Sequence, residues 1–288
     1  MPEAPETAAA GSRAAGPDFL VVPLWQGSSS ARAMSLQAGA EAICADLPAS
    51  RTRIVEIPVE AGDDLGTPIR RLSAVQHVQA QVREALSAST PPVLLVGGDA
   101  SADLAGVAHA LERDPDTCLL WLGAHAALHD GVSSPDGAAH RMVVRALMGS
   151  VHPSLTPPRP LERSRLVLAG VRGLDEAEAD FARQADLAIV PPDAPDWPNA
   201  VAEAVAATGA GRLYIHVDVD VLDPAEILSV HFPEPFGVTV PQLLAAIAAA
   251  RAVLPLAGAA IAEFSPDSPD DVVADMGTVL RLVGALRR

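Results

Sequence analysis

The 288-residue sequence contains no lysine, so all 20 of its basic residues are arginines, while 36 acidic residues give it a formal net charge of −16. This acidic balance argues against a nucleic-acid partner or an anionic membrane surface and permits a neutral or cationic small molecule. Only two cysteines are present, Cys44 and Cys118, without CxxC spacing. We therefore expect a reducing, cytoplasmic compartment and no disulfide framework. No apolar run reaches the length of a membrane span.

The start of the chain also lacks the features of a signal peptide. Residues 1–17 contain neither a basic n-region nor an apolar h-region, which predicts a disordered N-terminal tail. With 49% hydrophobic residues the chain can bury a large core. No linker or internal repeat interrupts residues 18–288, so they are predicted to form a single domain.

Buried strands alternate with helical segments along this domain. Strands are predicted at 19–24, 53–59, 93–96, 118–122, 165–171, 187–190, from 213 onward, and at 257–264. Helices are predicted at 34–46, 69–87, 103–112, 138–148, 175–184, 197–207, 240–253 and 272–286. The alternation is typical of the α/β class, with three layers (α/β/α) and a mostly parallel sheet.

One predicted strand, in the stretch from Leu213 to Pro224, carries a dense group of ionisable residues. Because strand side chains alternate between faces, His216, Asp218 and Asp220 should project from one side together. Two buried carboxylates need a metal ion, another cation or shared protons. The carboxyl end of a parallel strand is also where α/β proteins place their active sites, so we predict the site here.

Four strand-end motifs extend this group. They read GGDA at 97–100, GAHAA at 123–127, DVDVLDP at 218–224 and EFSP at 263–266. In this order and spacing they resemble the ureohydrolase family of arginase, agmatinase and formimidoylglutamase. That family carries GGDH, DAHxD, DxDxxDP and an ExNP-like segment at its strand ends. The resemblance covers most of the chain and implies an arginase-like fold.

The resemblance also implies a metal centre, but the sequence departs from it. Family members hold two manganese ions through six side chains of these motifs, and Ala100, Gly123 and Ala127 stand at three of those positions. Neither alanine nor glycine ligates through a side chain. We therefore expect no binuclear centre and no cofactor, with a single divalent metal as the alternative. The three ligands that remain are His125, Asp218 and Asp220.

Histidines occur at several other positions that correspond to site residues of the family. By resemblance, His140 matches a proton-shuttling histidine, Glu263 a guanidinium-binding glutamate, and His129 replaces a substrate-binding asparagine. His216 replaces a small hydroxyl residue, and the pair His231 and Phe232 replaces a glycine and a substrate-facing threonine. We expect these four histidines and His125 to face one pocket. The predicted catalytic residues are His125, His140, Asp218, Asp220, Glu263 and His231; those predicted to bind substrate are His129, His216 and Phe232.

Coupled carboxylates and imidazoles titrate near neutral pH, as general acid–base catalysis requires. The first functional hypothesis is therefore a homo-oligomeric, divergent enzyme of a specialised biosynthetic pathway, with lyase, isomerase or cyclase chemistry on a small molecule. A second hypothesis is a pseudoenzyme that binds a ligand or partner without catalysis. A third is a residual single-metal amidinohydrolase.

Overall fold

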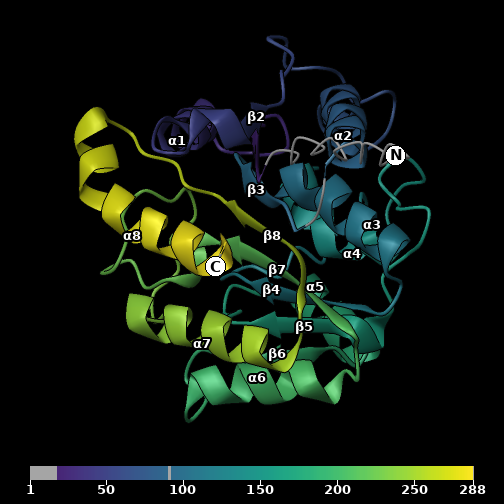
Figure 1. Ribbon diagram of the computed structural model, residues 1–288. Coiled ribbons are helices and arrows are strands. Elements are labelled where there is room, and N and C mark those ends of the chain that lie inside the picture. Colours follow the sequence, from purple (N-terminus) through teal and green to yellow (C-terminus); the bar gives the residue numbers. More distant parts are fainter. Residues whose placement is uncertain (1–17, 90–91, 288) are drawn as a thin grey trace, which may run out of the picture.

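The computed structural model describes residues 18–89 and 92–287 (Figure 1). The predicted N-terminal tail lies outside these residues. Eight parallel strands form one sheet in the order β2-β1-β3-β8-β7-β4-β5-β6. The strands are β1 (Phe19–Val22), β2 (Thr52–Ile54), β3 (Leu94–Gly97), β4 (Thr117–Leu122), β5 (Leu166–Ala169), β6 (Ala188–Val190), β7 (Arg212–Asp218) and β8 (Leu256–Ala262).

Helices connect the strands and cover both faces of the sheet. The helices are α1 (Met34–Ala45), α2 (Leu72–Ser87), α3 (Leu104–Arg113), α4 (Val143–Leu147), α5 (Glu176–Gln184), α6 (Trp197–Ala207), α7 (Val240–Val253) and α8 (Pro269–Arg287). Short 3-10 turns are η1 (Ala49–Arg51), η2 (Ala100–Asp103), η3 (Ala139–Met142), η4 (Arg163–Arg165) and η5 (Val219–Val221).

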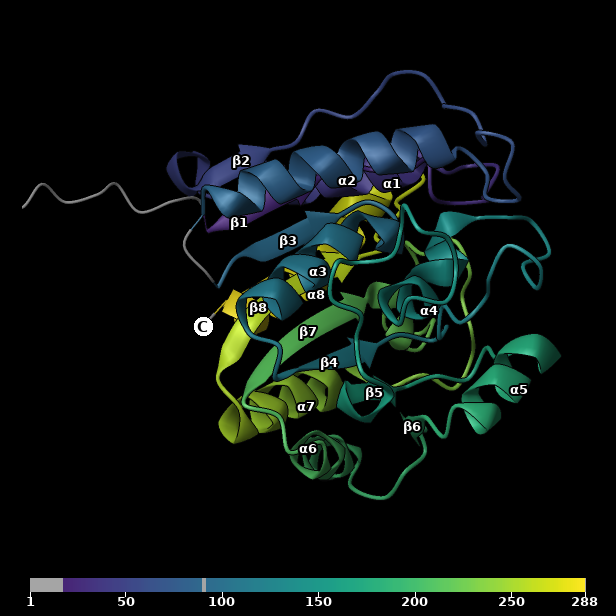
Figure 2. The ribbon, with the colours of Figure 1, turned by 90° about the vertical axis from the view of Figure 1, so that its right-hand side faces the viewer.

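Two hydrophobic clusters, one on each face of the sheet, make up the core. The apolar residues of α2, α3 and α4 pack on one face, and those of α1, α6, α7 and α8 pack on the other. Residues of one strand alternate between the clusters, as Leu119 and Leu120 of β4 do. Figures 1 and 2 show the sheet between these helical layers. The predicted three-layer α/β class is therefore confirmed, with an all-parallel sheet.

Several predicted elements are shorter than expected. The second strand ends at Ile54 rather than residue 59, and the helix predicted from residue 69 begins at Leu72. Arg71 has a left-handed backbone (φ 55°), which a helix cannot continue through. The helix predicted at 138–148 consists of η3 followed by the short α4. No helix within 18–89 or 92–287 is long and apolar enough to cross a membrane.

The four strands that carry the motifs are neighbours in the middle of the sheet, in the order β3-β8-β7-β4. Because all are parallel, their carboxyl ends meet at one edge, where Ala100, Gly123, Asp218 and Glu263 lie at or just beyond the last strand residue. This topology brings together motifs that are separated by up to 166 residues. The predicted site therefore assembles from strands that are not consecutive in sequence.

Candidate active site

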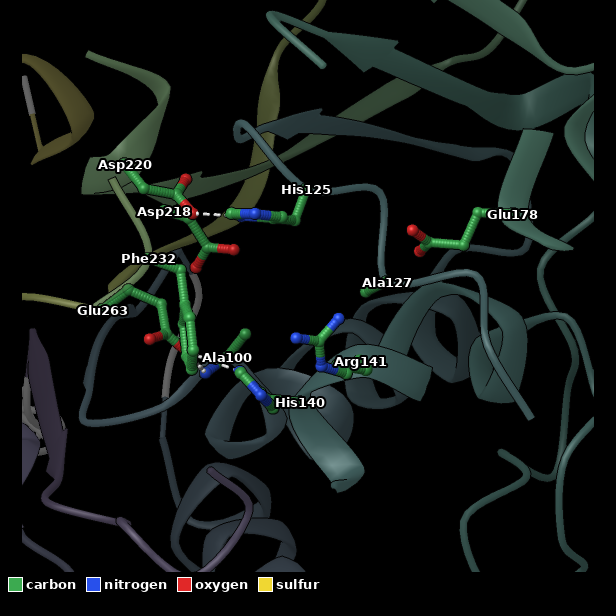
Figure 3. A pocket seen from close by; sticks show the side chains of 10 residues that line it. All are labelled: Ala100, His125, Ala127, His140, Arg141, Glu178, Asp218, Asp220, Phe232 and Glu263. Atoms are coloured by element: carbon green, nitrogen blue, oxygen red, sulfur yellow. Dashed lines mark hydrogen bonds and ion pairs between the residues drawn. The ribbon is translucent and has the colours of Figure 1, made fainter. Parts of the chain in front are cut away.

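A small pocket lies at this edge of the sheet, and Figure 3 shows its lining. Its volume is about 30 Å³, room for about two water molecules. Four carboxylates, two imidazoles and one guanidinium surround it together with apolar groups. The lining residues are Ala100, His125, Ala127, His140, Arg141, Glu178, Asp218, Asp220, Phe232 and Glu263.

Asp218, the last residue of β7, is the pocket end of a buried chain of polar groups. Its Oδ1 lies 2.9 Å from His216 Nε2, and His216 Nδ1 lies 2.9 Å from Asp103 Oδ2. The hydroxyl of Tyr214 donates to Asp103 Oδ1. Burial opposes the charge of His216, but the charge of Asp218 and the hydrogen bonds to both carboxylates raise the pKa of His216 to about 10. The imidazolium neutralises a carboxylate that would otherwise be buried alone.

Strand pairing fixes the orientation of His216. The residue lies opposite Trp121 of β4, and the two rings are stacked with centroids 3.7 Å apart and planes 7° apart. The Trp121 indole N–H donates to the His125 carbonyl oxygen at 2.9 Å. Burial raises the pKa of Asp218 above its usual range, although His216 counteracts it. The indole, the imidazole and Asp218 thus form one fixed wall beneath the pocket.

Asp220 lies beyond the strand, in η5, and pairs with a different histidine. Its Oδ2 is 2.8 Å from His125 Nδ1, and its Oδ1 accepts the Ala124 N–H at 2.9 Å. Burial opposes the charge of His125, but its hydrogen bond to Asp220 and the charges of Asp220 and Glu234 raise the pKa of His125 to about 9. Because one nitrogen is held by Asp220, the other is directed to the side of Glu234, 3.7 Å away.

Glu263 and His140 form a third pair on the next wall. Glu263 follows β8 with a left-handed backbone (φ 66°), and its Oε1 accepts the Ala100 N–H at 2.9 Å. A non-glycine residue in this region is strained, a feature that clusters at functional sites. His140 Nδ1 is 3.4 Å from the same oxygen. Burial opposes the charge of His140, but the hydrogen bond and charge of Glu263 raise its pKa above the usual range.

Phe232 lies between these two histidine pairs. Its ring centroid is 6.4 Å from that of His125 and 5.6 Å from that of His140. The Arg141 guanidinium lies 5.7 Å from the same ring. An aromatic side chain therefore divides the polar pocket and narrows it.

The other three predicted histidines do not line the pocket. His216 is fully buried below Asp218, because residues two apart on a strand share a face but differ in depth. His231 Nε2 bonds to Ser35 Oγ of α1 at 2.8 Å, which turns its ring aside. His129 packs against the start of α5, with Nε2 3.1 Å from Asp175 Oδ2 and 3.8 Å from Glu178 Oε2. The expectation of five histidines in one pocket was wrong for these three.

Comparison with known proteins identifies the relatives of this chain. The model of the arginase family matches residues 16–280. The chain belongs to the arginase family. It is 32% identical to an arginase of Bacillus caldovelox over 200 residues, which are 62% of this chain and 63% of that protein. It is 29% identical to a guanidinopropionase of Pseudomonas aeruginosa over 231 residues, 78% of this chain and 67% of that enzyme. The matched segment thus spans less than two thirds of that arginase.

Solved arginase structures share the fold. The arginase of Entamoeba histolytica, solved in complex with L-ornithine, has a TM-score of 0.82 and 18% identity over 96% of this chain and 99% of its own. The formimidoylglutamase of Bacillus subtilis has a TM-score of 0.75 and 19% identity over 98% of this chain and 89% of its own. At these identities the likeness establishes the arginase-like fold alone.

Arginase-family membership corrects one prediction. The expectation that the chain has no cofactor is wrong, because the structure of this arginase-family chain contains a group suited to a metal ion. That group is formed by His129, Asp175 and Glu178, whose ligand atoms all lie within 4.8 Å of one another. Only His129 of these three was selected from the sequence, and as a substrate-binding residue.

Several residues of the site were not predicted from the sequence. Asp103 lies 113 residues before His216 and opens a helical segment, where an aspartate is usually a cap. Arg172 joins two loops by donating to the carbonyl oxygens of Asp220 at 2.9 Å and Glu234 at 2.7 Å. Glu178 stands on an amphipathic helix that resembles any solvated one. None of the four motifs that carry the resemblance includes Arg172 or Glu178, so the resemblance did not point to either residue.

Proposed function

We propose that this chain is an arginase-family enzyme that performs acid–base chemistry of the lyase, isomerase or cyclase type on a small cationic molecule. The observation that carries the proposal is that both carboxylates of the strand-end pair are bonded to histidines. Asp218 is bonded to His216 and Asp220 to His125, each at a distance below 3 Å. These pairs supply positive charge and protons at the place where family members hold manganese.

The residues present do not fit the family's two-ion centre. Ala100 and Ala127 contribute methyl groups to the pocket wall in place of metal ligands. A side chain at Gly123 would begin 3.0 Å from Trp121 Nε1 and 3.5 Å from Asp218 Cβ, so the indole would have to move by a few tenths of an ångström to admit an aspartate. No step of the proposed chemistry passes through a pair of ions.

Two histidine–carboxylate pairs provide the proton transfers. His125 is oriented by Asp220, with its second nitrogen on the side of Glu234, and His140 is oriented by Glu263. Within the described residues, His140 Nε2 is buried without a hydrogen-bond partner. A carboxylate that holds one imidazole nitrogen fixes the ring and stabilises the imidazolium that forms when the other nitrogen takes a proton. The two rings flank Phe232, so one can remove a proton while the other donates one.

The pocket favours a cation with an apolar part. Asp218, Asp220 and Glu263 lie on one side of it, across from Arg141 and Glu178 (Figure 3). The carboxylate oxygens on this wall that are not bonded to a histidine can accept hydrogen bonds from a guanidinium, amidinium or ammonium group. Phe232 offers an aromatic face to the same ligand, which favours a cation or an apolar stem beside it. Substrate recognition therefore remains compatible with the cationic ligands of the family, while the chemistry differs.

Turnover of a substrate panel tests this proposal. Purified protein is incubated with small molecules that bear guanidinium, amidinium or amino groups, and products are detected by mass spectrometry, with urea measured separately. We expect a product without release of urea from arginine or agmatine. His125→Gln and His140→Gln should each lower the rate by about 100-fold or more, as loss of a general acid or base does. His77→Gln, on the exposed face of α2, is the matched control.

Two outcomes contradict the proposal. Robust manganese-dependent release of urea from arginine by the unmodified chain would establish ordinary family hydrolysis. Saturable binding of a panel molecule without turnover, unchanged in His125→Gln and His140→Gln, would establish a binding protein instead.

A further inference from the structure

A second cluster of ligand-type side chains lies beside the pocket, in residues that the acid–base chemistry does not use. His129 follows β4 in the GAHAALHD segment, and Asp175 and Glu178 belong to the start of α5. The two parts are 46 residues apart in sequence and meet only in the fold. His129 and Glu178 are buried, and the Asp175 side chain is 49% exposed.

The buried Nε2 of His129 lacks a hydrogen-bond partner among the described residues. This nitrogen lies 3.1 Å from Asp175 Oδ2 but makes no hydrogen bond to any described residue, because the ring does not point along that line. The side chain is fully buried, so water does not satisfy the nitrogen freely. The ligand atoms of His129, Asp175 and Glu178 all lie within 4.8 Å of one another. A cation meets all three donors at once, whereas a proton on Nε2 would be poorly aligned with both oxygens.

The second polar atom of each donor residue is already held by the protein. His129 Nδ1 lies 3.2 Å from Ser133 Oγ, which leaves Nε2 as the free nitrogen. Asp175 Oδ1 accepts the Glu178 N–H at 2.9 Å, and Glu178 Oε1 accepts the Leu128 N–H at 3.0 Å. In both carboxylates one oxygen is anchored and the other is free. Outer contacts of this kind orient metal ligands in proteins.

The spacing of the free atoms suits a first-row divalent ion. Two donors at about 2.1 Å from an ion lie roughly 3.0–3.4 Å from each other in octahedral or tetrahedral geometry. The separation of 3.1 Å from His129 Nε2 to Asp175 Oδ2 is within that range. The 3.8 Å to Glu178 Oε2 needs a shift of a few tenths of an ångström. One imidazole and two carboxylates suit a transition ion better than calcium or magnesium, which prefer oxygen ligands alone.

From these contacts we propose that His129 Nε2, Asp175 Oδ2 and Glu178 Oε2 bind one divalent transition-metal ion. The site is distinct from the strand-end aspartates, which lie on the opposite side of the pocket from Glu178 (Figure 3). Glu178 belongs both to this cluster and to the pocket wall, so the ion lies at the border of the pocket. Three protein donors leave coordination positions open for water or for an anionic oxygen of a ligand.

Manganese binding to the whole chain tests the site. Protein stripped with a chelator is titrated with Mn²⁺, and free Mn²⁺ is followed by its electron paramagnetic resonance signal. We expect one ion per chain, displaced by Zn²⁺, which binds mixed nitrogen and oxygen sites more tightly. His129→Asn and Glu178→Gln should remove this binding. Asp175→Asn should weaken it at least tenfold while keeping the helix cap, since asparagine caps as well as aspartate.

Control variants separate this site from the rest of the molecule. His77→Asn and Glu203→Gln change exposed helical residues and should leave one ion bound. Asp218→Asn should also leave it bound. No binding by the unmodified chain would overturn the proposal, as would binding that survives Asp175→Asn and Glu178→Gln or that is lost in Asp218→Asn. Because ion stoichiometry is measured without substrate, the result is independent of the proposed catalytic chemistry.

Discussion

Asp218 and His216 stand two residues apart on the same face of β7, joined by a bond of 2.9 Å between Oδ1 and Nε2. The opposite nitrogen of the imidazole is bonded to Asp103, and the ring is stacked on Trp121. The imidazole therefore lies between two carboxylates without contact with solvent, and these carboxylates hold its pKa at about 10. In an arginase-family protein, this bond places an internal cation next to an aspartate of the strand-end pair.

The first prediction separates the charge of Asp218 from its hydrogen bond. Asp218→Asn keeps an oxygen that accepts from His216 Nε2, but it removes the negative charge from the pocket. We expect the turnover found with the substrate panel to fall by about 100-fold or more, with a change in unfolding free energy of about 1 kcal/mol or less. Asp180→Asn, in α5 with a half-exposed side chain, is the control. The measurements are initial rates and thermal melting.

An Asp218→Asn variant that keeps full activity would contradict this prediction. If Asp218→Asn melts higher than the unmodified protein and reacts equally well, the carboxylate is a relic of an earlier metal site. Removal of a buried charge without functional cost would then favour the pseudoenzyme hypothesis.

Gly106 of α3 gives a second prediction about the buried chain of polar groups. A Cβ at this position would lie 2.2 Å from Asp103 Oδ1 and 2.5 Å from the Tyr214 hydroxyl. Gly106→Ala should therefore destabilise the fold by about 1–3 kcal/mol in urea unfolding. Gly277→Ala, in α8, meets no atom within 4 Å and should stabilise by about 0.5–1 kcal/mol through helix propensity. Equal effects of the two substitutions would show that the Asp103 contacts are not closely packed.

The positions of several strand-end residues of the site could be predicted from the sequence, and those that could not have a physical explanation. The alternation of strand residues placed His216 and Asp218 on one face, as the structure has them. The same rule also predicted Asp220 on this face, which was wrong because the strand ends at Asp218 and a 3-10 turn redirects the next residues. Asp220 consequently meets His125 instead of its strand neighbours. Motif order located the strand ends, since parallel strands must end at a common edge.

Contacts between side chains that are far apart in the sequence could not be predicted from it. Ser35 and His231 are 196 residues apart, and only the packing of α1 beside the loop shows that they bond. The helix start that brings Asp175 to His129 has an ordinary capping pattern, which carries no sign of a ligand role. The alanines and the glycine at three motif positions, Ala100, Gly123 and Ala127, could be read directly from the sequence. The new donor group next to the pocket could not, so the expectation of no cofactor failed.

The dependence of stability on pH provides a third prediction. The folded-state pKa of His125 is about 9, whereas an unperturbed histidine titrates near 6.5. The stability from its pairing with Asp220 is fully present below pH 6.5 and is lost as the pH rises through about 9. With a chelator present, we expect the unmodified chain to lose up to about 3 kcal/mol more than His125→Gln between pH 6.5 and 10.

The unmodified chain is compared with His125→Gln because the pKa of His216 is also raised, to about 10, so His216 loses its proton in the same pH range. Its contribution is present in both proteins and cancels in the difference. Urea unfolding at half-unit pH steps measures the two curves. Parallel curves would mean that His125 is neutral in the folded protein and that its bond to Asp220 is not an ion pair.

The last prediction concerns the space beside Gly123. Ala100→His, Gly123→Asp and Ala127→Asp together restore the ligand types of the family's two-ion centre. With Trp121 present, the Cβ at position 123 would lie 3.0 Å from the indole nitrogen, which is itself bonded to the His125 carbonyl oxygen. We therefore expect the threefold variant to bind no more manganese per chain than the unmodified protein, as measured by elemental analysis after gel filtration.

Adding Trp121→Leu to the three substitutions should change this result. The smaller side chain removes the contact with position 123 and the stack on His216, which frees Asp218 to turn toward an ion. We expect additional manganese per chain in the fourfold variant only, at a stability cost of about 3 kcal/mol for the buried aromatic ring. Trp121→Leu alone is the control and should gain no ion. If the threefold variant gains two ions with Trp121 in place, the tryptophan does not exclude the metal, and missing ligands alone account for the departure from the family.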